Sequence, residues 1–139
     1  GADVDARTFV DSTPLHMATR NGELALVRLL VERYKAKCDV ADEDGDTPLH
    51  AAASTDQVTM VQLLVDGGAS PDAKGKSGAT ALHWAVGKGQ LAVARYLLDA
   101  GARVDARDDD GETPLHWAVK REWQPLVNIQ IEVMRLLVA

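Results

Sequence analysis

The chain has 139 residues, of which 15 are Lys or Arg and 21 are Asp or Glu, and its formal net charge is −6 at pH 7. This is the length of about one domain, and because aromatic residues make up only 4% of it, the core must be built from Leu, Val and Ala. The acidic balance argues against nucleic acid as the main partner and favours a basic or mixed protein surface. No apolar run reaches membrane-spanning length, so no membrane association is expected.

A tetrapeptide of the form Thr-Pro-Leu-His recurs along the chain. The copies are Thr13-Pro14-Leu15-His16, Thr47-Pro48-Leu49-His50, Thr80-Ala81-Leu82-His83 and Thr113-Pro114-Leu115-His116. Their threonines lie 34, 33 and 33 residues apart. A fixed period of this kind is the signature of a repeat architecture, in which each unit packs only on its neighbours.

Each copy has the features of a helix start. In the first, the hydroxyl of Thr13 can accept a backbone N–H of the first turn, and Pro14 suits the first helical position, where no N–H is needed. Leu15 and Ala18 then fall on one helical face, and the small alanine lets a neighbouring helix approach closely.

A second helix is expected to follow each of these short first helices. Gly22 and Gly89 predict where the first helix ends, and Asp56 holds that place in the second unit, although it tolerates the left-handed conformation less well than glycine. The next helix of the first unit has an apolar stripe made by Leu24, Val27, Leu30 and Val31.

A tight turn is predicted before each tetrapeptide, where the pattern Asp-x-x-Gly places a glycine two residues ahead of the threonine. The glycines are Gly45, Gly78 and Gly111, and Asp11 holds that place in the first unit. Each unit is therefore predicted to be turn, helix, turn, helix. Because neither short helix is stable alone, the stacked units must bury a continuous aliphatic layer.

With these motifs at this period, the chain resembles the ankyrin repeat family. The resemblance covers essentially the whole chain and implies an all-α solenoid of stacked helix-turn-helix units with β-turn or hairpin fingers. It implies one ankyrin-repeat domain over residues 1–139, with units at about 1–34, 35–67, 68–100 and 101–139. The chain starts inside a turn and stops after an apolar triplet, so we expect a fragment of a longer protein.

The fourth unit carries an insertion of seven residues between Ala118 and Ile131. Seven residues make about two helical turns, which would keep the apolar face in phase. Because the residue before a proline avoids the helical conformation, we expect the first helix to end near Glu122 and a lengthened second helix to run from Pro125 to Val138. Ile131, Met134 and Leu137 would then face the stack. A simple loop expansion is the alternative.

Cys38 is the single cysteine, so a disulfide within the chain is excluded and a metal site would need companions that the sequence lacks. We expect a reduced thiol in a monomeric cytoplasmic or nuclear protein.

The histidines all lie inside the tetrapeptides. A metal cluster or a catalytic base would need them to converge, whereas stacking spaces them along the array. We therefore expect each ring to hydrogen-bond the turn backbone of its own or the next unit. The run Asp108-Asp109-Asp110 with Glu112 lacks EF-hand spacing and predicts a solvated turn. No enzymatic activity, cofactor or metal is expected.

Two kinds of position escape the packing pattern and are candidates for contact with a partner. In ankyrin proteins the turn tips and the first helices line a concave groove that holds the partner, and the resemblance implies the same here. The turn tips are Phe9, Val10, Ser12, Glu43, Asp44, Asp46, Lys76, Ser77, Ala79, Asp109, Asp110 and Glu112. The helix positions are Arg20, Asn21, Ser54, Thr55, Gly87, Lys88, Lys120 and Arg121.

Charge is uneven along these positions. Residues 35–67 hold two basic and seven acidic side chains, whereas residues 68–100 hold four basic and two acidic ones. A partner protein or peptide with a basic segment opposite Glu43, Asp44 and Asp46 would match this distribution. Plain solubility is the alternative.

Trp84 and Trp117 follow the histidines of consecutive tetrapeptides. Tryptophan is favoured at binding hot spots, and two of them could form an aromatic shelf. Their places resemble those of a methyl-lysine cage in the ankyrin domains of some histone-lysine methyltransferases, which would use cation–π attraction. Ala79 and Gly87 depart from that pattern, and structural packing is the alternative.

Three classes of function remain open at this point. A protein–protein interaction module is favoured. A regulatory or targeting segment of a larger enzyme is the second, and the third is a ligand or nucleic-acid binder that stacks on the tryptophans. The third predicts a basic groove, which the flanking acidic turns oppose.

Overall fold

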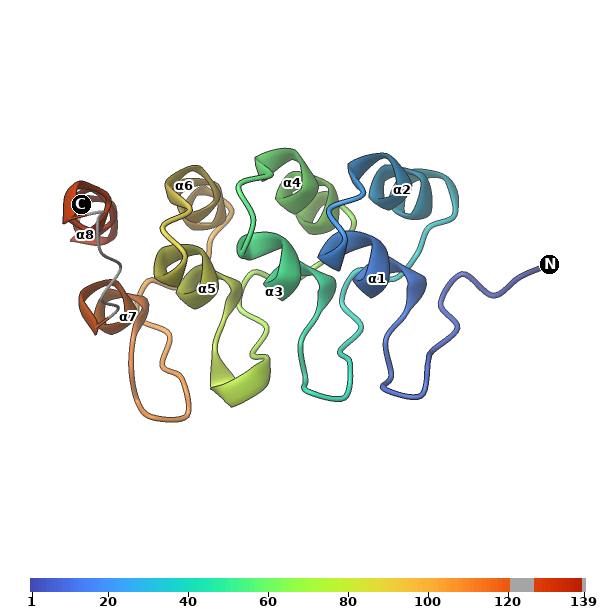
Figure 1. Cartoon of the computed structure of the whole chain (residues 1–139), viewed down its shortest axis with the longest axis horizontal. Helices are drawn as coiled ribbons and strands as arrows, with labels where there is room; N and C mark the ends of the chain where they lie inside the picture. The colour runs from blue at the N-terminus through green and yellow to red at the C-terminus, as the bar shows by residue number, and fades with distance from the viewer. Residues whose placement is uncertain (121–126, 139) are drawn as a thin grey trace.

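Short helices follow one another in pairs along the chain (Figure 1). The computed structural model describes residues 1–120 and 127–138. The helices are α1 Pro14–Arg20, α2 Leu24–Arg28 with its π-helical continuation η1 Leu29–Arg33, α3 Pro48–Ala53, α4 Val58–Asp66, the 3-10 turn η2 Lys76–Gly78, α5 Ala81–Gly87, α6 Leu91–Asp99, α7 Pro114–Lys120 and α8 Val127–Val138. No strand is found among these described residues, so the all-α prediction is confirmed and the hairpin form of the fingers is not.

The helices form two rows (Figure 1). Helices α1, α3, α5 and α7 make an inner row, and α2, α4, α6 and α8 make an outer row. Each inner helix contacts its neighbours in the row and the outer helix of its own pair, as α5 does with α3, α7 and α6. The turns project from the inner row on the side away from the outer row (Figure 1). The chain is thus a solenoid of stacked helix pairs.

The core lies between the two rows and is aliphatic, as the composition predicted. Leu15, Leu49 and Leu82 are fully buried on the inner helices, and Val27 and Val61 are fully buried on the outer ones. The alanines that lie three residues after the buried leucines are buried too, where neighbouring inner helices approach each other. Burial of one such large side chain contributes about 1.5–3 kcal/mol, so the stacked rows carry most of the stability.

The end of the first helix differs between the pairs in the way the glycines predict. Gly22 and Gly89 both have φ +71°, the left-handed conformation. Asp56, at the corresponding place after α3, does not adopt it. There the hydroxyl of Thr55 accepts the backbone N–H of Gln57 at 3.2 Å. In the first pair the corresponding N–H, that of Glu23, donates to the carbonyl of Ala18 instead.

The last pair confirms one part of the insertion prediction and corrects another. Helix α8 ends at Val138, as expected, and with 12 residues it is longer than α4 and α6, which have 9 each. The expected helix boundaries at Glu122 and Pro125 lie outside the described residues. The prediction that Ile131 and Met134 face the stack is wrong, because they are 42% and 39% exposed, whereas Val133 is 2% exposed. Leu137 packs against the core as predicted, together with Leu136, since both share one helical face with Val133.

Candidate functional site

The turns in front of the inner helices are five-residue fingers with one common geometry. We number them finger 1 (residues 8–12), finger 2 (42–46), finger 3 (75–79) and finger 4 (108–112). In each, the backbone N–H of the first residue donates to the carbonyl of the fifth at 2.8–2.9 Å, and the N–H of the fourth donates back to the first at 3.0 Å. The fourth residues, Asp11, Gly45, Gly78 and Gly111, all have positive φ. The predicted turns are therefore confirmed, including the exceptional Asp11.

Buried carboxylates close fingers 2 and 4 from within. Asp42 Oδ1 accepts the backbone N–H groups of Asp44 and Asp46, each at 3.0 Å. Asp108 Oδ1 does the same for Asp110 at 3.0 Å and Glu112 at 2.8 Å. Both aspartates are buried, so the prediction of a solvated turn is wrong for Asp108, although Asp109 and Asp110 are exposed. Finger 1 uses the hydroxyl of Thr8 instead, which accepts the N–H of Ser12 at 3.2 Å.

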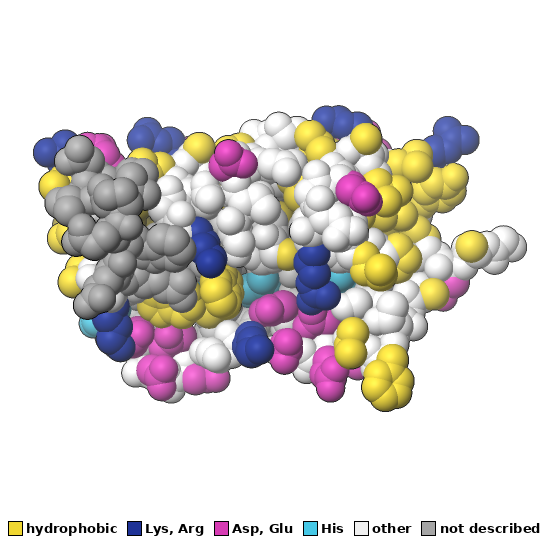
Figure 2. All heavy atoms as spheres, in the orientation of Figure 1, with side chains coloured by type: hydrophobic (Ala, Val, Ile, Leu, Met, Phe, Trp, Pro, Cys, Tyr) yellow, Lys and Arg dark blue, Asp and Glu magenta, His cyan; other side chains and the backbone are white. Residues whose placement is uncertain are grey.

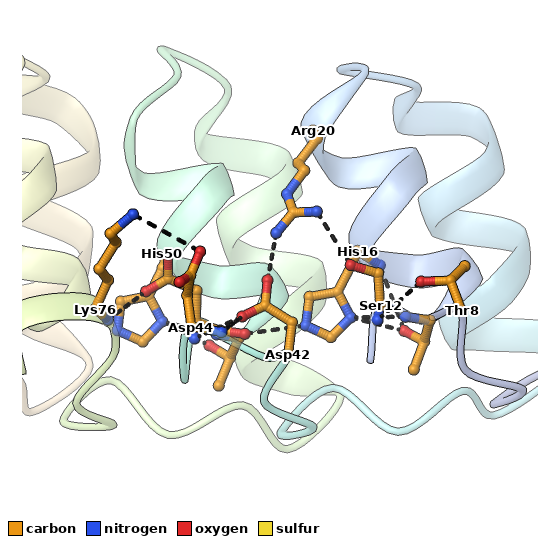
Figure 3. A network of polar contacts seen from close by, with 11 residues as sticks. Thr8, Ser12, His16, Arg20, Asp42, Asp44, His50 and Lys76 are labelled. Atoms are coloured by element: carbon orange, nitrogen blue, oxygen red, sulfur yellow. Dashed lines mark hydrogen bonds and ion pairs between the residues drawn. The ribbon is translucent and has the colours of Figure 1, made fainter. Parts of the chain in front are cut away.

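The histidines of α1, α3 and α5 join their helix to the next finger, as the sequence predicted. In α1, His16 Nδ1 accepts the backbone N–H of Thr13 at 3.1 Å, so the ring proton lies on Nε2, which donates to the carbonyl of Asp46 in finger 2 at 3.1 Å (Figure 3). His83 reaches the carbonyl of Glu112 in finger 4 at 2.9 Å in the same way. Burial lowers the pKa of both His16 and His83, which keeps these rings neutral.

The fingers are also joined directly to one another. Between fingers 1 and 2, the N–H of Glu43 donates to the carbonyl of Val10 at 3.2 Å. Between fingers 2 and 3, Asp46 Oδ1 accepts the N–H of Lys76 at 2.8 Å. Between fingers 3 and 4, the N–H of Asp109 donates to the carbonyl of Ser77 at 3.0 Å. These bonds hold the fingertips at fixed spacings.

Arg20 makes a further bridge between the first two helix pairs (Figure 3). Its guanidinium donates to the hydroxyl of Ser12 at 3.1 Å and forms an ion pair with Asp42 Oδ2. The carboxylate of Asp42 is buried while the arginine side chain is half-exposed. Sequence reasoning assigned Arg20 only to partner contact and missed this internal role.

We call the four fingers together with the exposed sides of α1, α3, α5 and α7 the finger face. Most of the predicted positions are exposed there: Phe9, Val10, Arg20, Asn21, Glu43, Asp44, Lys76, Ser77, Lys88, Asp109, Asp110 and Lys120. Phe9 is 104% exposed, which places its whole ring in solvent. Ser54, Thr55, Asp46, Glu112, Trp84 and Trp117 are half-buried. Arg121 lies outside the described residues.

The prediction that all turn-tip positions are exposed is wrong for Ser12 and Ala79, which are 3% and 0% exposed. Each is the fifth residue of its finger and directly precedes the capping threonine, but Asp46 and Glu112 at the same finger position are only half-buried. Gly87 is buried as well. A pattern of polar and apolar residues could not show the burial of Ser12, because its hydroxyl accepts a bond from Arg20, eight residues away.

Acidic side chains gather along the edge that the fingers form, with basic side chains above and between them (Figure 2). Most of the acids belong to fingers 2 and 4, and finger 1 adds Asp11. Finger 3 instead holds Lys76, whose Nζ lies 3.8 Å from Asp44 Oδ2. The finger face thus has one basic finger, finger 3, between the two acidic fingers 2 and 4. Both acidic fingers belong to the turn tips that the sequence predicts.

Trp84 and Trp117 lie together between fingers 3 and 4. Their rings are 5.3 Å apart, edge to face at 82°, and the indole N–H of Trp117 donates to Asp108 Oδ2 at 2.8 Å. They line an open pocket of about 410 Å³, which we call the Trp pocket. Its walls also include Lys76, Ser77, Asp108, Asp110, Glu112 and Lys120. The sequence predicted the pairing of the two tryptophans but missed Asp108 as their neighbour.

In residues 1–120 and 127–138, no group of three or more His, Cys, Asp and Glu side chains is placed to hold a metal ion. No helix within those ranges has the length and apolar character needed to cross a bilayer.

Comparison with known proteins identifies the chain at the level of a family. A family model described as ankyrin repeats (3 copies) matches residues 1–75 and 68–139, which together cover the chain. No curated protein matches it.

Proposed function

Because the chain belongs to the ankyrin repeat family, whose members are generally protein–protein interaction modules, we propose that it binds a partner protein or peptide through the fingertips and the groove along its inner helices. Solenoids of this kind offer extended surfaces for such contacts. We treat residues 1–139 as one domain of four units that acts without catalysis.

The observation that carries this proposal is the rigid spacing of exposed tips. Backbone bonds join finger 1 to finger 2 and finger 3 to finger 4, and the Asp46 carboxylate joins finger 2 to finger 3. Side chains such as Phe9 and Glu43 project from this frame with no packing role. A partner that docks on fixed fingers loses less free energy to ordering than one that docks on mobile loops.

The charge of the finger face favours a partner with a basic segment. Glu43 and Asp44 are exposed on finger 2, and Asp109 and Asp110 are exposed on finger 4. Opposite charges steer association and fix the register of an extended ligand. Phe9 adds a large apolar contact at the first finger, next to Val10, which is 46% exposed. The preferred ligand is therefore an extended basic segment with an apolar residue toward finger 1.

Two further assignments belong to the same proposal. The thiol of Cys38 is 2% exposed, which suits a reduced cysteine in the cytoplasm or nucleus. We take the binding unit to be a monomer, because each helix pair packs on its neighbours within the same chain. A regulatory or targeting segment of a larger enzyme would use the same finger face, so this alternative changes the context and not the binding surface.

A selection of displayed random peptides on the wild-type chain tests the proposal. The selected peptide is then measured against Phe9→Ser/Glu43→Lys on the finger face and against Thr59→Lys/Gln62→Lys on α4. Thr59 and Gln62 are exposed on the outer row, and the two double variants raise the net charge equally. The finger variant should bind at least about tenfold more weakly, a loss of roughly 1.4 kcal/mol, while the α4 variant binds like the wild type. Equal losses in both variants would contradict the proposal.

A further inference from the structure

The first two helix pairs contain a cation site that the protein fills itself. Arg20 comes seven residues after the capping Thr13 and lies between Ser12 of finger 1 and the buried carboxylate of Asp42 in finger 2 (Figure 3). Buried carboxylates are stabilised in this way by a guanidinium, which offers several donors in one plane. The pair of Arg20 with Asp42 thus indicates that the space beside a buried finger aspartate can hold a guanidinium group.

The corresponding place between the third and fourth pairs lacks the internal arginine. Seven residues after Thr80 the chain has Gly87, and the finger residue that corresponds to Ser12 is Ala79. The buried carboxylate is present, because Asp108 closes finger 4 as Asp42 closes finger 2. The hydrogen bonds that Asp108 accepts come from neutral donors, namely the Trp117 indole and the amides of Asp110 and Glu112.

The surroundings of Asp108 favour a cation with a flat, delocalised charge. Two indoles at 82° to each other line the Trp pocket, and an aromatic face attracts a cation that lies over it. Asp110 adds an exposed carboxylate and Glu112 a half-buried one. The volume of about 410 Å³ is in the range of small-ligand pockets. A guanidinium stacks on aromatic rings and pairs with carboxylates more effectively than an ammonium group.

We propose that the Trp pocket, between the third and fourth helix pairs, receives an arginine side chain of the bound partner, at the place that corresponds to that of Arg20 between the first and second pairs. This proposal rests on the proposed function, because it names one contact of the partner on the finger face. Lys120 limits the affinity, since its ammonium group already pairs with Glu112 at the rim of the pocket.

The test uses N-acetyl-arginine amide as the probe and the neutral isostere N-acetyl-citrulline amide as its matched control. Both are titrated into the full chain while the indole N–H signals of Trp84 and Trp117 are followed by NMR, with assignment from Trp→Phe variants. Saturable shifts with the arginine probe are expected, with at least about tenfold weaker binding of the citrulline probe, because a cation–π contact and a charge pair are lost together.

Variants at the rim sharpen the result. Lys120→Gln should tighten arginine binding by about two- to fivefold, the effect of removing one exposed competing ion pair. Arg28→Gln on α2 changes the net charge equally but lies on the outer row, so it should leave the affinity unchanged. Asp110→Asn should weaken binding.

Three results would overturn the assignment: equal binding of the citrulline probe, no saturable shift of either indole, or tighter binding of N-acetyl-trimethyllysine amide than of the arginine probe. The last would identify a methyl-lysine cage instead. The peptide selection described above does not depend on these probes, so failure here with a positive selection would reject the arginine site and leave the proposed function standing.

Discussion

The carboxylate of Asp46 occupies the space in which a side chain on Gly75 would lie. A Cβ built on Gly75 would overlap Asp46 Oδ1 and would stand 2.9 Å from His50 Nε2. The same oxygen accepts the N–H of Lys76 at 2.8 Å. Finger 3 begins with a glycine, whereas fingers 2 and 4 begin with Asp42 and Asp108. The carboxylate that finger 3 lacks comes from Asp46 of finger 2.

Gly75→Ala should therefore destabilise the array, although the φ of Gly75 is negative, at −104°. Overpacking of this kind costs about 1–3 kcal/mol of the free energy of unfolding, which urea denaturation would measure. Asp46→Ala in the same chain removes the overlapping group, so the double variant should cost less than the sum of the two single variants. A Gly75→Ala chain as stable as the wild type would show that finger 3 does not enclose Asp46 in this way.

Stability should also fall in mild acid because of the buried histidines. Burial lowers the pKa of His16 and His83 below the ordinary 6.5, so the folded state resists protons that the unfolded state accepts. The contribution of these rings is complete above that pH and is lost as the pH falls toward the folded pKa. The free energy of unfolding should drop between pH 7 and pH 5.5 by up to about 1.4 kcal/mol per pH unit for each ring.

The control for this pH effect is the loss of one ring at a time. His16→Gln and His83→Gln should each be less stable at pH 7, because a neutral ring that joins helix and finger is removed. Each should also show a shallower dependence of unfolding free energy on pH in urea titrations. A slope identical to that of the wild type would mean that these rings do not carry the pH response.

The fold and the finger geometry could be predicted because they depend on local chemistry. Capping by Thr13, termination at Gly22 and the left-handed fourth finger residue Gly45 are each decided within a few positions of the chain. The role of His16 followed from the period, since a residue that recurs once per unit must meet the same neighbour each time. Because these features recur in each unit, their pattern can be recognised from the sequence.

Relationships between fingers could not be predicted in the same way. Asp46 accepts a hydrogen bond from finger 3, and Arg20 pairs with Asp42. Both contacts depend on distances between units, which a local sequence pattern does not determine. The predicted phase of the last helix is wrong for a related reason. A whole number of turns in the insertion would bury Met134, but the contacts of α8 with α6 and α7 bury Val133 and leave Met134 exposed.

Cys38 should react slowly with thiol reagents in the folded chain. Its thiol is buried, and burial raises its pKa from the ordinary 9.0 to about 11. At pH 8 the reactive thiolate is then roughly a hundredfold scarcer than in the unfolded chain, because thiolate is the nucleophile. Labelling with a chromogenic disulfide should be slow in buffer and fast in concentrated urea. Equal rates in both solutions would show an accessible thiolate in the folded state.

Because Trp117 donates a hydrogen bond to Asp108, the stability of the fourth finger should depend on pH in the acidic range. Burial raises the pKa of Asp108, but the hydrogen bonds from Trp117, Glu112 and Asp110 outweigh burial and hold the pKa below its ordinary 3.8. A carboxyl with a lowered folded pKa contributes stability that is present above its unfolded value and is lost as the pH falls through the folded one.

Trp117→Phe removes the indole donor and keeps an aromatic ring, so it should cost about 1.5–3 kcal/mol at pH 7, the range for a hydrogen bond to a charged group. The cost should shrink as the pH is lowered below about 4, because Asp108 becomes protonated in both chains. Urea unfolding from pH 7 to pH 3 would measure it. In an Asp108→Asn background the same substitution should lose this pH dependence, since no carboxylate remains to titrate. A cost that stays constant with pH in the wild-type background would mean that Trp117 acts through packing alone, without stabilising the charge of Asp108.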